Sequence, residues 1–351
     1  MMQAPDPAPK KADRAARTGT GGVTLMDVAK LAGVSAITVS RALNTPGTVS
    51  AKTLERVRAA VGQSGYVPNL VAGGLASNRS RLVAALVPTV AGPVFLETIQ
   101  ALTDTLAAAG CQLMLGQTGY EDKDSDREDA LLDAIIGRRP AGIVLTGVMH
   151  SVQGRRRLIA SGIPVVETWD LSDDPIDMMV GFSHEAVGVA VADALFARGF
   201  RRPGILTAND DRALRRRAGF EQRFAELGVP HIPVCIVPAP SSLANGRTGF
   251  ADLRRQHPEI DVVFCGSDVI AHGVITEAQA EGLSIPRDIA VMGFGDLPFA
   301  AHTHPPLATV RIDGLSIGQQ AARFILGRMD KQDVGPSVRD VGFSIVQRSS
   351  L

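Results

Sequence analysis

The chain has 351 residues, of which 45% are hydrophobic and 4% aromatic, and its formal net charge is zero. This length predicts about two or three domains around a largely aliphatic core. No apolar run reaches the roughly 18 residues of a membrane span, and no secretory signal is recognisable. The three cysteines are too far apart to indicate a disulfide framework. We therefore expect no membrane association and a cytoplasmic location.

The charge is unevenly distributed along the chain. Residues 1–81 contain 11 Lys and Arg against four Asp and Glu, whereas the remainder contains 25 basic and 32 acidic residues. A basic head on an acidic body favours a polyanionic partner for the head. Residues 1–22 are rich in Pro, Ala, Gly and Lys and predict a disordered tail. A solvated basic tail is therefore the alternative explanation of the excess charge.

The segment 24–43 predicts two short helices joined by a tight turn. Thr24 and Asp27 form a Ser/Thr-x-x-Asp/Glu pair, which is a sequence signature of a helix start. Gly33 can end this first helix in the left-handed conformation. Ser35 is a favourable N-cap for the second helix, which then runs to about residue 43.

A third helix is predicted over about 51–63, after the breaking sequence Asn44-Thr45-Pro46-Gly47 and with Ser50 as its N-cap. Three short helices with a Gly-containing turn between the first two describe a helix-turn-helix. We therefore assign 23–66 to a small all-α headpiece.

One face of the second helix carries Ala36, Ile37, Ser40 and Arg41, opposite the inward-facing Val39. Exposing Ile37 to water contributes nothing to folding. Against DNA, Ala36 and Ile37 can contact a thymine methyl group, and Arg41 can pair with guanine O6 and N7. A small three-helix bundle with one surface arginine is the alternative.

Residues 67–81 predict a hinge helix and a linker. Asn69 can cap a short helix over 70–77, but the two glycines in it cost roughly 1 kcal/mol each, so the helix should be marginal alone. Leu75 lies on this helix with no core nearby in the sequence. The segment is either a flexible linker or a helix that folds on DNA and inserts Leu75 into the minor groove.

Aliphatic runs alternate with amphipathic stretches from residue 82 onward. The predicted strands are 82–88, 111–117, 141–147, 164–170, 203–208, 262–267 and 289–295. The predicted helices lie near 95–109, 126–138, 153–161, 184–198, 213–227, 243–256 and 269–281. This alternation predicts parallel sheets covered on both faces. Seven strand–helix units are too many for one compact sheet, so we expect residues 82–351 to form two lobes. The break between the lobes should lie near 180–183, and a late helix near 315–327 should cross back to the first lobe.

Ligands of open α/β sheets bind beyond the carboxyl ends of the strands. The residues predicted there are largely polar, as a polyol site requires: Thr89, Gln117, Thr146, Trp169, Asn209, Asp268 and Asp296. Trp169, the single tryptophan, is equally compatible with buried packing. Four arginines follow Asn209 near a predicted helix start, which favours a bound anion, with a solvated basic face as the alternative.

The segments VTLMDVAKLAGVSAITVSRALN, VSAKTLERV, GYVPN and LVAGGLAS resemble, in order and spacing, the lactose and purine repressor family of bacterial transcriptional regulators. The resemblance covers nearly the whole chain from about residue 23. It implies a helix-turn-helix headpiece with a hinge helix, followed by an α/β two-lobed periplasmic-binding-protein-like domain with parallel sheets over 82–351.

The resemblance also implies DNA contacts. Bases are read by Ala36, Ile37 and Arg41, the backbone is contacted or supported by Thr24, Ser35, Thr38, Ser40, Asn44 and Asn69, and Leu75 intercalates. Lys52 is expected to contact phosphate. Because one helix-turn-helix reads too few base pairs for genomic specificity, we expect a homodimer on a near-palindromic operator. A tetramer is not expected, since no leucine heptads follow GFSIVQRSS.

In the body, RRRAGF aligns with a family motif in which Arg216 faces the effector, and CGSDVIAHG with one in which Asp268 holds ligand hydroxyls. PIDMMVGFSHEAVG and RALRRRAGF are similar to the gluconate-responsive repressor branch, with Ser183 at a position where family members often carry another polar contact. The implied function is a repressor of sugar-acid genes, with gluconate or a close aldonate held by Arg216. The alternatives are a regulator that responds to a neutral sugar or phosphosugar, and a soluble sugar-binding protein.

Enzyme chemistry finds little support in the sequence. The phosphate-binding patterns GxGxxG and GxxxxGK[ST] are absent. Ser183, His184 and Glu185 are chain neighbours and cannot easily point at one another as a catalytic triad. His302 and His304 lie in a Pro-rich loop without nearby Cys or acidic ligands, so a surface loop is favoured over a metal site. We expect no catalytic residues, metal or cofactor.

Overall fold

The structure is a computed structural model that describes residues 22–67, 80–90, 92–120, 125–148 and 151–351. These residues divide into two compact units, called here the headpiece (22–67) and the body (80–351), and each is described by itself. The predicted hinge helix, with Asn69 and Leu75, lies outside the described residues, as does the predicted tail up to residue 21.

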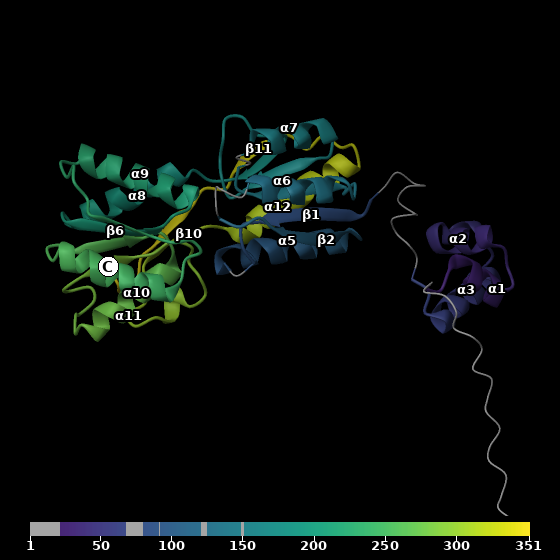
Figure 1. Ribbon diagram of the computed structural model, residues 1–351, viewed down its shortest axis with the longest axis horizontal. Helices are drawn as coiled ribbons and strands as arrows, with labels where there is room; N and C mark the ends of the chain where they lie inside the picture. The colour runs from purple at the N-terminus through teal and green to yellow at the C-terminus, as the bar shows by residue number, and fades with distance from the viewer. Residues whose placement is uncertain (1–21, 68–79, 91, 121–124, 149–150) are drawn as a thin grey trace, which may run out of the picture. The chain divides into compact units, whose positions relative to one another are not determined.

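The headpiece is a bundle of three helices (Figure 1): α1 (Leu25–Ala32), α2 (Ala36–Asn44) and α3 (Ala51–Ser64), with a 3₁₀ turn η1 (Pro46–Thr48) after α2. The capping box of Thr24 and Asp27 is formed, and Gly33 ends α1 at a φ of 60°. Three fully buried valines, one from each helix, form the centre of the bundle: Val28, Val39 and Val57. The predicted helix-turn-helix is therefore confirmed.

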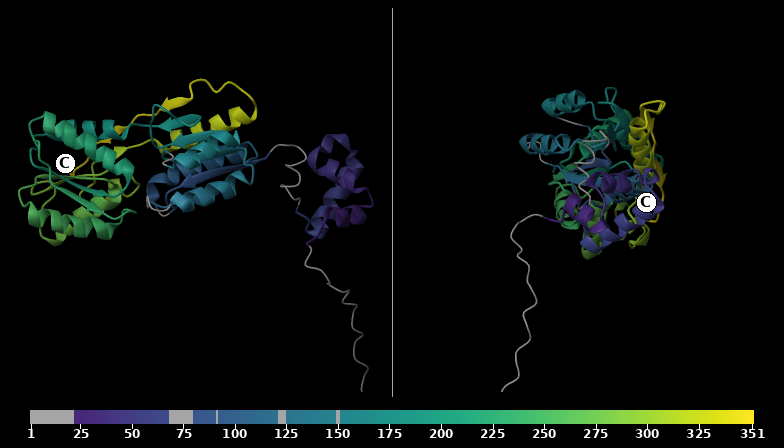
Figure 2. Two further views of the ribbon diagram at one scale, coloured as in Figure 1. Left: turned by 45° about the horizontal axis from the view of Figure 1, so that its top comes forward. Right: turned by 90° about the vertical axis from the view of Figure 1, so that its right-hand side faces the viewer.

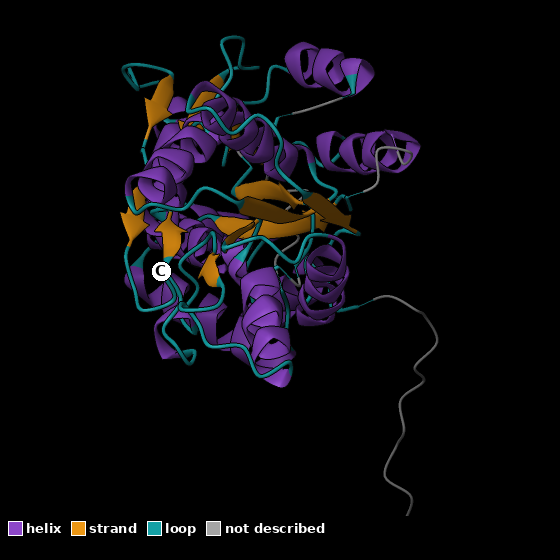
Figure 3. Cartoon of the chain, turned by 90° about the vertical axis from the view of Figure 1, so that its left-hand side faces the viewer, coloured by secondary structure: helices purple, strands orange, loops and turns teal. Residues whose placement is uncertain are grey.

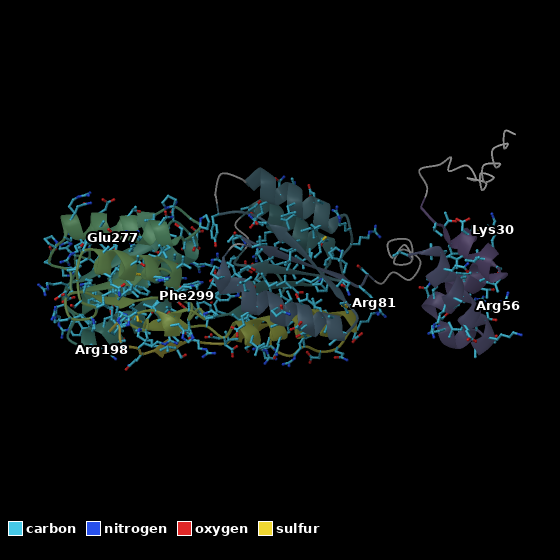
Figure 4. The ribbon with its side chains drawn as sticks, turned by 90° about the horizontal axis from the view of Figure 1, so that it is seen from below. Lys30, Arg56, Arg81, Arg198, Glu277 and Phe299 are labelled. Atoms are coloured by element: carbon cyan, nitrogen blue, oxygen red, sulfur yellow. The ribbon has the colours of Figure 1, made fainter. Side chains whose placement is uncertain are left out.

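Arg56, labelled in Figure 4, lies on α3 and bonds to the end of α1 and to the turn that follows it. Its guanidinium donates to the carbonyl oxygens of Ala32 and Gly33. The last carbonyls of a helix have no partner within the helix, so this arginine satisfies them and fixes the turn. The role of Arg56 was not predicted from the sequence, because the contact joins residues more than 20 positions apart.

The first lobe of the body is built on a six-stranded parallel sheet of order β11-β5-β4-β3-β1-β2. Its strands are β1 (Leu82–Val87), β2 (Gln112–Gln117), β3 (Gly142–Thr146), β4 (Val165–Thr168), β5 (Met178–Gly181) and β11 (Val338–Asp340). The accompanying helices are α5 (Leu96–Ala108), preceded by the 3₁₀ turn η2 (Pro93–Phe95), α6 (Ser125–Ile136), α7 (Val152–Ser161) and α12 (Gly314–Met329).

The second lobe contains a four-stranded parallel sheet of order β7-β6-β8-β9. Its strands are β6 (Pro203–Ala208), β7 (Val234–Val237), β8 (Val262–Cys265) and β9 (Ala290–Met292), and an antiparallel pair, β10 (Thr309–Arg311) and β12 (Ser344–Val346), lies beside β9. Its helices are α8 (His184–Ala197), α9 (Asp211–Glu226), α10 (Leu243–Gln256), α11 (Asp268–Ala280) and the 3₁₀ turn η4 (Ala300–His302). Helices lie on both sides of the strands (Figure 3).

The chain passes between the two lobes of the body three times, after β5, after β10 and after β11. The second passage leads to α12, which packs on α5, β4 and β5 of the first lobe. In Figure 2, α12 is the yellow helix that lies with the blue and teal elements from much earlier in the chain. The predicted return of a late helix to the first lobe is confirmed, and so is the predicted two-lobed α/β fold class.

Five short strands were not predicted: β5, β7, β10, β11 and β12. Each has only three or four residues. In β11 all three residues are exposed, so no apolar run marks it. The apolar strands that were predicted all exist, and the structure shortens several of them by a few residues at their ends.

The aliphatic core predicted from composition has an aromatic centre where the lobes meet. The ring centroids of Phe95 and Trp169 are 5.2 Å apart, those of Trp169 and Phe182 5.9 Å, and those of Phe182 and Phe294 6.2 Å. These rings belong to one buried cluster that extends into both lobes. No helix among the described residues is both long and apolar enough to span a membrane.

Replacing Gly188 by alanine is expected to destabilise the body. Gly188 on α8 faces α9 so closely that a Cβ atom there would overlap the backbone carbonyl oxygen of Arg216. Because backbone cannot move aside as a flexible side chain can, Gly188→Ala should cost roughly 1–3 kcal/mol or more. Gly62→Ala, in the last turn of α3 with no atom within 4 Å of the added carbon, should instead stabilise the headpiece by at most roughly 0.5–1 kcal/mol. Calorimetric unfolding of both variants checks this, and an unchanged body transition in Gly188→Ala would contradict it.

Candidate functional site

The outer face of α2 carries the side chains predicted to read DNA bases. Ile37 is 66% exposed, an unfavourable environment that contact with another molecule would relieve. Arg41 is exposed one helical turn later on the same face. Ala36 is only partly exposed, because it also packs against the headpiece core. The geometry therefore supports Ile37 and Arg41 as the reading pair more strongly than Ala36.

The side chains predicted to contact or support the DNA backbone lie at helix ends. Ser35 Oγ caps α2 by accepting from the backbone N–H of Thr38 at 3.2 Å. Asn44 Nδ2 donates to Ser40 Oγ at 3.3 Å at the other end of α2. Lys52 is exposed in the first turn of α3. Helix N-termini and their hydroxyl groups are frequent phosphate contacts, so the positions of Ser35 and Lys52 at helix starts suit that role, which stays a prediction.

In the body, Arg216 on α9 is buried opposite the start of α8. Its NH1 donates to His184 Nδ1 and its NH2 to the carbonyl oxygen of Gly266, both at 2.9 Å. The guanidinium carbon lies 3.8 Å from the centroid of the Phe294 ring, within cation–π distance. Burial lowers the pKa of Arg216 to about 10, so the side chain stays cationic at neutral pH.

Arg212 lies one turn before Arg216 and reaches the first lobe. Its Nε donates to Asp210, the N-cap of α9, at 3.3 Å, and its guanidinium carbon is 5.2 Å from the ring centroid of Phe95. A Cβ atom at Gly147 of the first lobe would be 3.8 Å from Arg212 NH1. The pKa of Tyr120 is raised, mainly by burial, and the charge of Arg212 opposes this shift. From the sequence, Arg212 was predicted only as one member of the arginine cluster, and Tyr120 was not predicted at this site.

Three buried polar side-chain atoms lack a hydrogen-bond partner within the described part of the chain: Thr207 Oγ1, Arg212 NH1 and Arg216 Nε. All three lie in β6 or the first half of α9, and all three can donate. Unpaired buried polar groups are rare in folded proteins and destabilise them. A ligand that offers several acceptor oxygens would satisfy these donors.

Protein carboxylates already engage the other two arginines of the cluster. Arg215 NH1 donates to the buried Asp170 at 2.9 Å, which joins α9 in the second lobe to the segment after β4 in the first. Arg217 pairs with Glu221 at 2.9 Å on the surface. The acidic N-cap of α9 offsets some of the repulsion between the arginines and the helix N-terminus. The arginine cluster thus leaves Arg212 and Arg216 with donors that lack a partner among the described residues, although Asp210 already offsets the charge of Arg212.

Trp169 packs between the lobes. It is 3% exposed, and its Nε1 donates to Thr98 Oγ1 at 3.0 Å. The rings of Phe95 and Phe182 approach it edge-on. Of the two alternatives for this tryptophan, the structure supports buried packing over direct contact with a ligand.

Asp268, at the start of α11, is fully buried. Its Oδ1 accepts from Thr309 Oγ1 at 2.5 Å and its Oδ2 from the backbone N–H of Leu297 at 2.7 Å, and burial raises its pKa to about 6. Asp296 pairs with Arg348 at 2.7 Å. Both carboxylates brace the segments around β10, so the geometry lends no support to their predicted roles as direct effector contacts.

The remaining predicted effector contacts are spread over the strand ends and the passage between lobes. Thr89, Gln117 and Thr146 lie at or after the ends of β1, β2 and β3, and Ser183 caps α8. Among the described residues, Arg216 donates to His184 and Gly266 rather than to Gln117, Thr146 or Ser183. Thr89 lies near the aromatic side chains around Arg212, since a Cβ atom at Gly92 would meet Thr89, Phe95 and Tyr120. The structure therefore gathers Arg212 and Arg216 with aromatic neighbours and has Thr89 beside that group.

Comparison with known proteins gives matches for both units. Residues 24–69 match the family described as bacterial regulatory proteins, lacI family, and residues 192–351 match a periplasmic binding protein-like domain. The HTH-type transcriptional regulator GntR of Pseudomonas aeruginosa is 38% identical over 343 residues, covering 97% of this chain and 98% of that protein. GntR of Escherichia coli K12 is 31% identical over 328 residues, covering 93% and 98%. The crystal structure of a lacI-family transcriptional regulator from Silicibacter pomeroyi is 34% identical with a TM-score of 0.88, covering 93% and 99%.

These similarities run through the headpiece and the body together, over nearly the full length of each relative. They agree with the capped helix-turn-helix and with the two-lobed body. The chain therefore belongs to the lacI family of bacterial regulatory proteins, in its gluconate branch, and is a DNA-binding transcriptional regulator rather than an enzyme.

Proposed function

We propose that this regulator is a cytoplasmic homodimer that binds a near-palindromic operator and represses sugar-acid genes, and that an effector of the gluconate type, bound between the lobes of the body, changes its affinity for DNA. The family relationship supports the class of protein. Two features of the described residues support the details: the exposed face of α2 and the unpaired donors on α9.

The exposed face of α2 is the observation that carries the DNA-binding proposal. Ile37 and Arg41 project from a helix whose opposite side is fixed in the headpiece core by Val39. A rigid helix with an apolar side chain and an arginine one turn apart fits the major groove, where thymine methyl groups and guanine edges are presented. Two such headpieces in a dimer would read two half-sites related by symmetry.

Arg41→Ala tests this role. The substitution is expected to weaken operator binding by about 1–3 kcal/mol while random DNA is affected much less, because base-edge contacts specify and phosphate contacts do not. Lys52→Ala is the matched control, since it removes an exposed cation from the next helix and should weaken all DNA about evenly. Fluorescence anisotropy with operator and scrambled duplexes at fixed salt measures both. Equal losses on the two duplexes for Arg41→Ala would contradict a base-reading role.

The effector proposal rests on Arg212 and Arg216, whose NH1 and Nε lack partners among the described residues. Carboxylates already pair with two arginines here, Arg215 with Asp170 and Arg212 with Asp210. Among the described residues, Arg216 donates only to His184 and to a carbonyl oxygen, so its positive charge matches one carboxylate. Gluconate supplies that carboxylate for charge-assisted hydrogen bonds, and its hydroxyl groups supply further acceptors for Thr207 and the arginine donors.

This placement revises the expected hydroxyl partners. Asp268 is fully buried and each of its oxygens already accepts an internal hydrogen bond, whereas Thr207 and Arg212 have donors without a partner among the described residues. We therefore place gluconate against β6 and the start of α9. Binding can regulate DNA only if gluconate prefers one arrangement of the lobes over another.

A further inference from the structure

A chain of four hydrogen bonds, joined in the middle by the covalent structure of Trp169, leads from Arg216 in the second lobe to two helices of the first. Arg216 NH1 donates to His184 Nδ1 at 2.9 Å, and His184 Nε2 contacts the carbonyl oxygen of Trp169 at 3.0 Å. The indole Nε1 of Trp169 donates to Thr98 Oγ1 on α5 at 3.0 Å. Thr98 Oγ1 then donates to the carbonyl oxygen of Gly314, the first residue of α12, at 3.0 Å.

All the bonds in this chain point the same way. A guanidinium can only donate and a carbonyl can only accept, so His184 must carry its proton on Nε2 and accept at Nδ1. Burial, followed by the charges of the nearby arginines, holds the pKa of His184 well below its usual range, which agrees with the neutral ring. Aligned hydrogen bonds in a buried, low-dielectric environment polarise one another, and His184, Thr98 and Trp169 are all at most 5% exposed.

His184 also limits where the guanidinium of Arg216 can lie. The guanidinium is held on three sides, by His184, by the carbonyl oxygen of Gly266 and by the ring of Phe294. This arrangement leaves Nε as the donor without a partner within the described residues. Movement of the guanidinium toward a ligand would pull directly on the imidazole.

The other end of this chain of hydrogen bonds lies where the polypeptide passes between the lobes. Trp169 has a φ of 65°, a left-handed conformation that a bulky residue adopts only when its surroundings enforce it. Hydrogen bonds at its carbonyl and at its indole hold it there. Gly314 follows directly after the second passage of the chain between lobes. A shift of Trp169 would therefore reach both α5 and α12.

We propose that His184 is a positioning residue with two roles: it sets Arg216 for the effector, and it passes a displacement of Arg216 through Trp169 and Thr98 to α5 and α12. This inference rests on the proposed function for the identity of the effector, but the hydrogen-bonded chain itself exists without any ligand.

The test uses the full chain labelled with 5-fluorotryptophan, which gives one ¹⁹F signal because the sequence has a single tryptophan. Two variants each keep half of the imidazole's bonding. His184→Asn places an oxygen near the position of Nδ1 and loses the bond to Trp169, whereas His184→Gln places an amide nitrogen near Nε2 and loses the acceptor for Arg216. Thr98→Val removes the hydroxyl that links Trp169 to Gly314, and so interrupts the hydrogen bonds at a later step. Thr103→Val is the matched control, since its hydroxyl bonds only within α5, to the carbonyl of Ile99.

Gluconate titration by calorimetry and the ¹⁹F signal are then compared. We expect His184→Gln to weaken gluconate binding roughly tenfold, and His184→Asn to weaken it less. Thr98→Val should bind gluconate as tightly as the unmodified chain. The gluconate-induced displacement of the ¹⁹F signal should be lost in His184→Asn and Thr98→Val and kept in Thr103→Val. Full displacement in His184→Asn and Thr98→Val, or unchanged affinity in His184→Gln, would overturn the proposal.

If gluconate does not bind the unmodified chain, the proposed effector is refuted. The role of His184 is then tested by a measurement without any ligand. Arg216→Lys removes the planar fork that bonds His184 and should displace the ¹⁹F signal of Trp169 in an otherwise unchanged chain. The same substitution should have no effect on that signal when combined with His184→Asn. A signal that ignores Arg216→Lys, or that responds equally in both backgrounds, would refute the transmission through His184.

Discussion

Arg216→Ala should weaken gluconate binding by at least about 2 kcal/mol, which corresponds to roughly a thirtyfold loss of affinity. The substitution would leave the effector carboxylate without its buried cation. Arg212→Ala should also weaken binding, but less, because the internal partner Asp210 already offsets the charge of Arg212. Arg217→Ala is the matched control: it removes an arginine from the same helix whose charge is spent on Glu221 at the surface, so gluconate affinity should not change.

Calorimetric titration with gluconate and with glucose separates the charge contribution from shape. The unmodified chain should prefer gluconate, and Arg216→Ala should lose that preference while thermal melting shows that the body remains folded. Arg216→Lys keeps the charge without the planar fork and should fall between the two. Glucose binding as tight as gluconate binding, or an unchanged affinity in Arg216→Ala, would favour a neutral sugar as the effector.

The headpiece could be predicted almost completely from sequence because local signals determine it. The capping box of Thr24 and Asp27, the left-handed Gly33 and the N-cap Ser35 each act within four residues, so a single sequence displays them directly. The long apolar strands of the body were equally visible, because strands buried on both faces are almost continuously hydrophobic. Arg56 was missed because its partners come from another helix.

The body site was only partly predictable, because its chemistry depends on pairing between lobes. The sequence displays four arginines near a helix start but not that Asp170, from the other lobe, engages Arg215. It displays a polar strand end at Asp268 but not that Thr309 and Leu297 use both of its oxygens. The ends of the strands predict the region in which a ligand binds in this fold. Which donors remain unpaired in that region is known only from the tertiary structure, which shows the partner of each side chain.

Asp268→Ala is expected to destabilise the body by roughly 2–5 kcal/mol, because it strands two buried donors. The donors are the hydroxyl of Thr309 and the backbone N–H of Leu297. Asp268→Asn keeps the shape and an acceptor for Leu297, and its amide can donate to the hydroxyl oxygen of Thr309. It should therefore be far milder than Asp268→Ala. Denaturant unfolding of both variants at pH 7 measures the difference, and equal losses would show that shape and hydrogen bonding at this position do not matter.

The pH dependence of the free energy of unfolding, compared between Asp268→Asn and the unmodified chain, tests whether burial disfavours the charged form of Asp268. Burial raises the pKa of Asp268 from its ordinary 3.8 to about 6, so the folded state binds this proton more tightly than the unfolded state does. This proton therefore contributes to the free energy of unfolding. The contribution is fully present below about pH 4 and is lost as the pH rises through about 6, and the loss amounts to at most about 3 kcal/mol. Asn at this position does not titrate, so the stability of Asp268→Asn relative to the unmodified chain should rise between pH 4 and 6 and then level off. Other titrating groups, including His184, are present in both proteins and cancel in the comparison. A relative stability that stays flat across this range, or that falls, would mean that the carboxylate is not disfavoured by its burial.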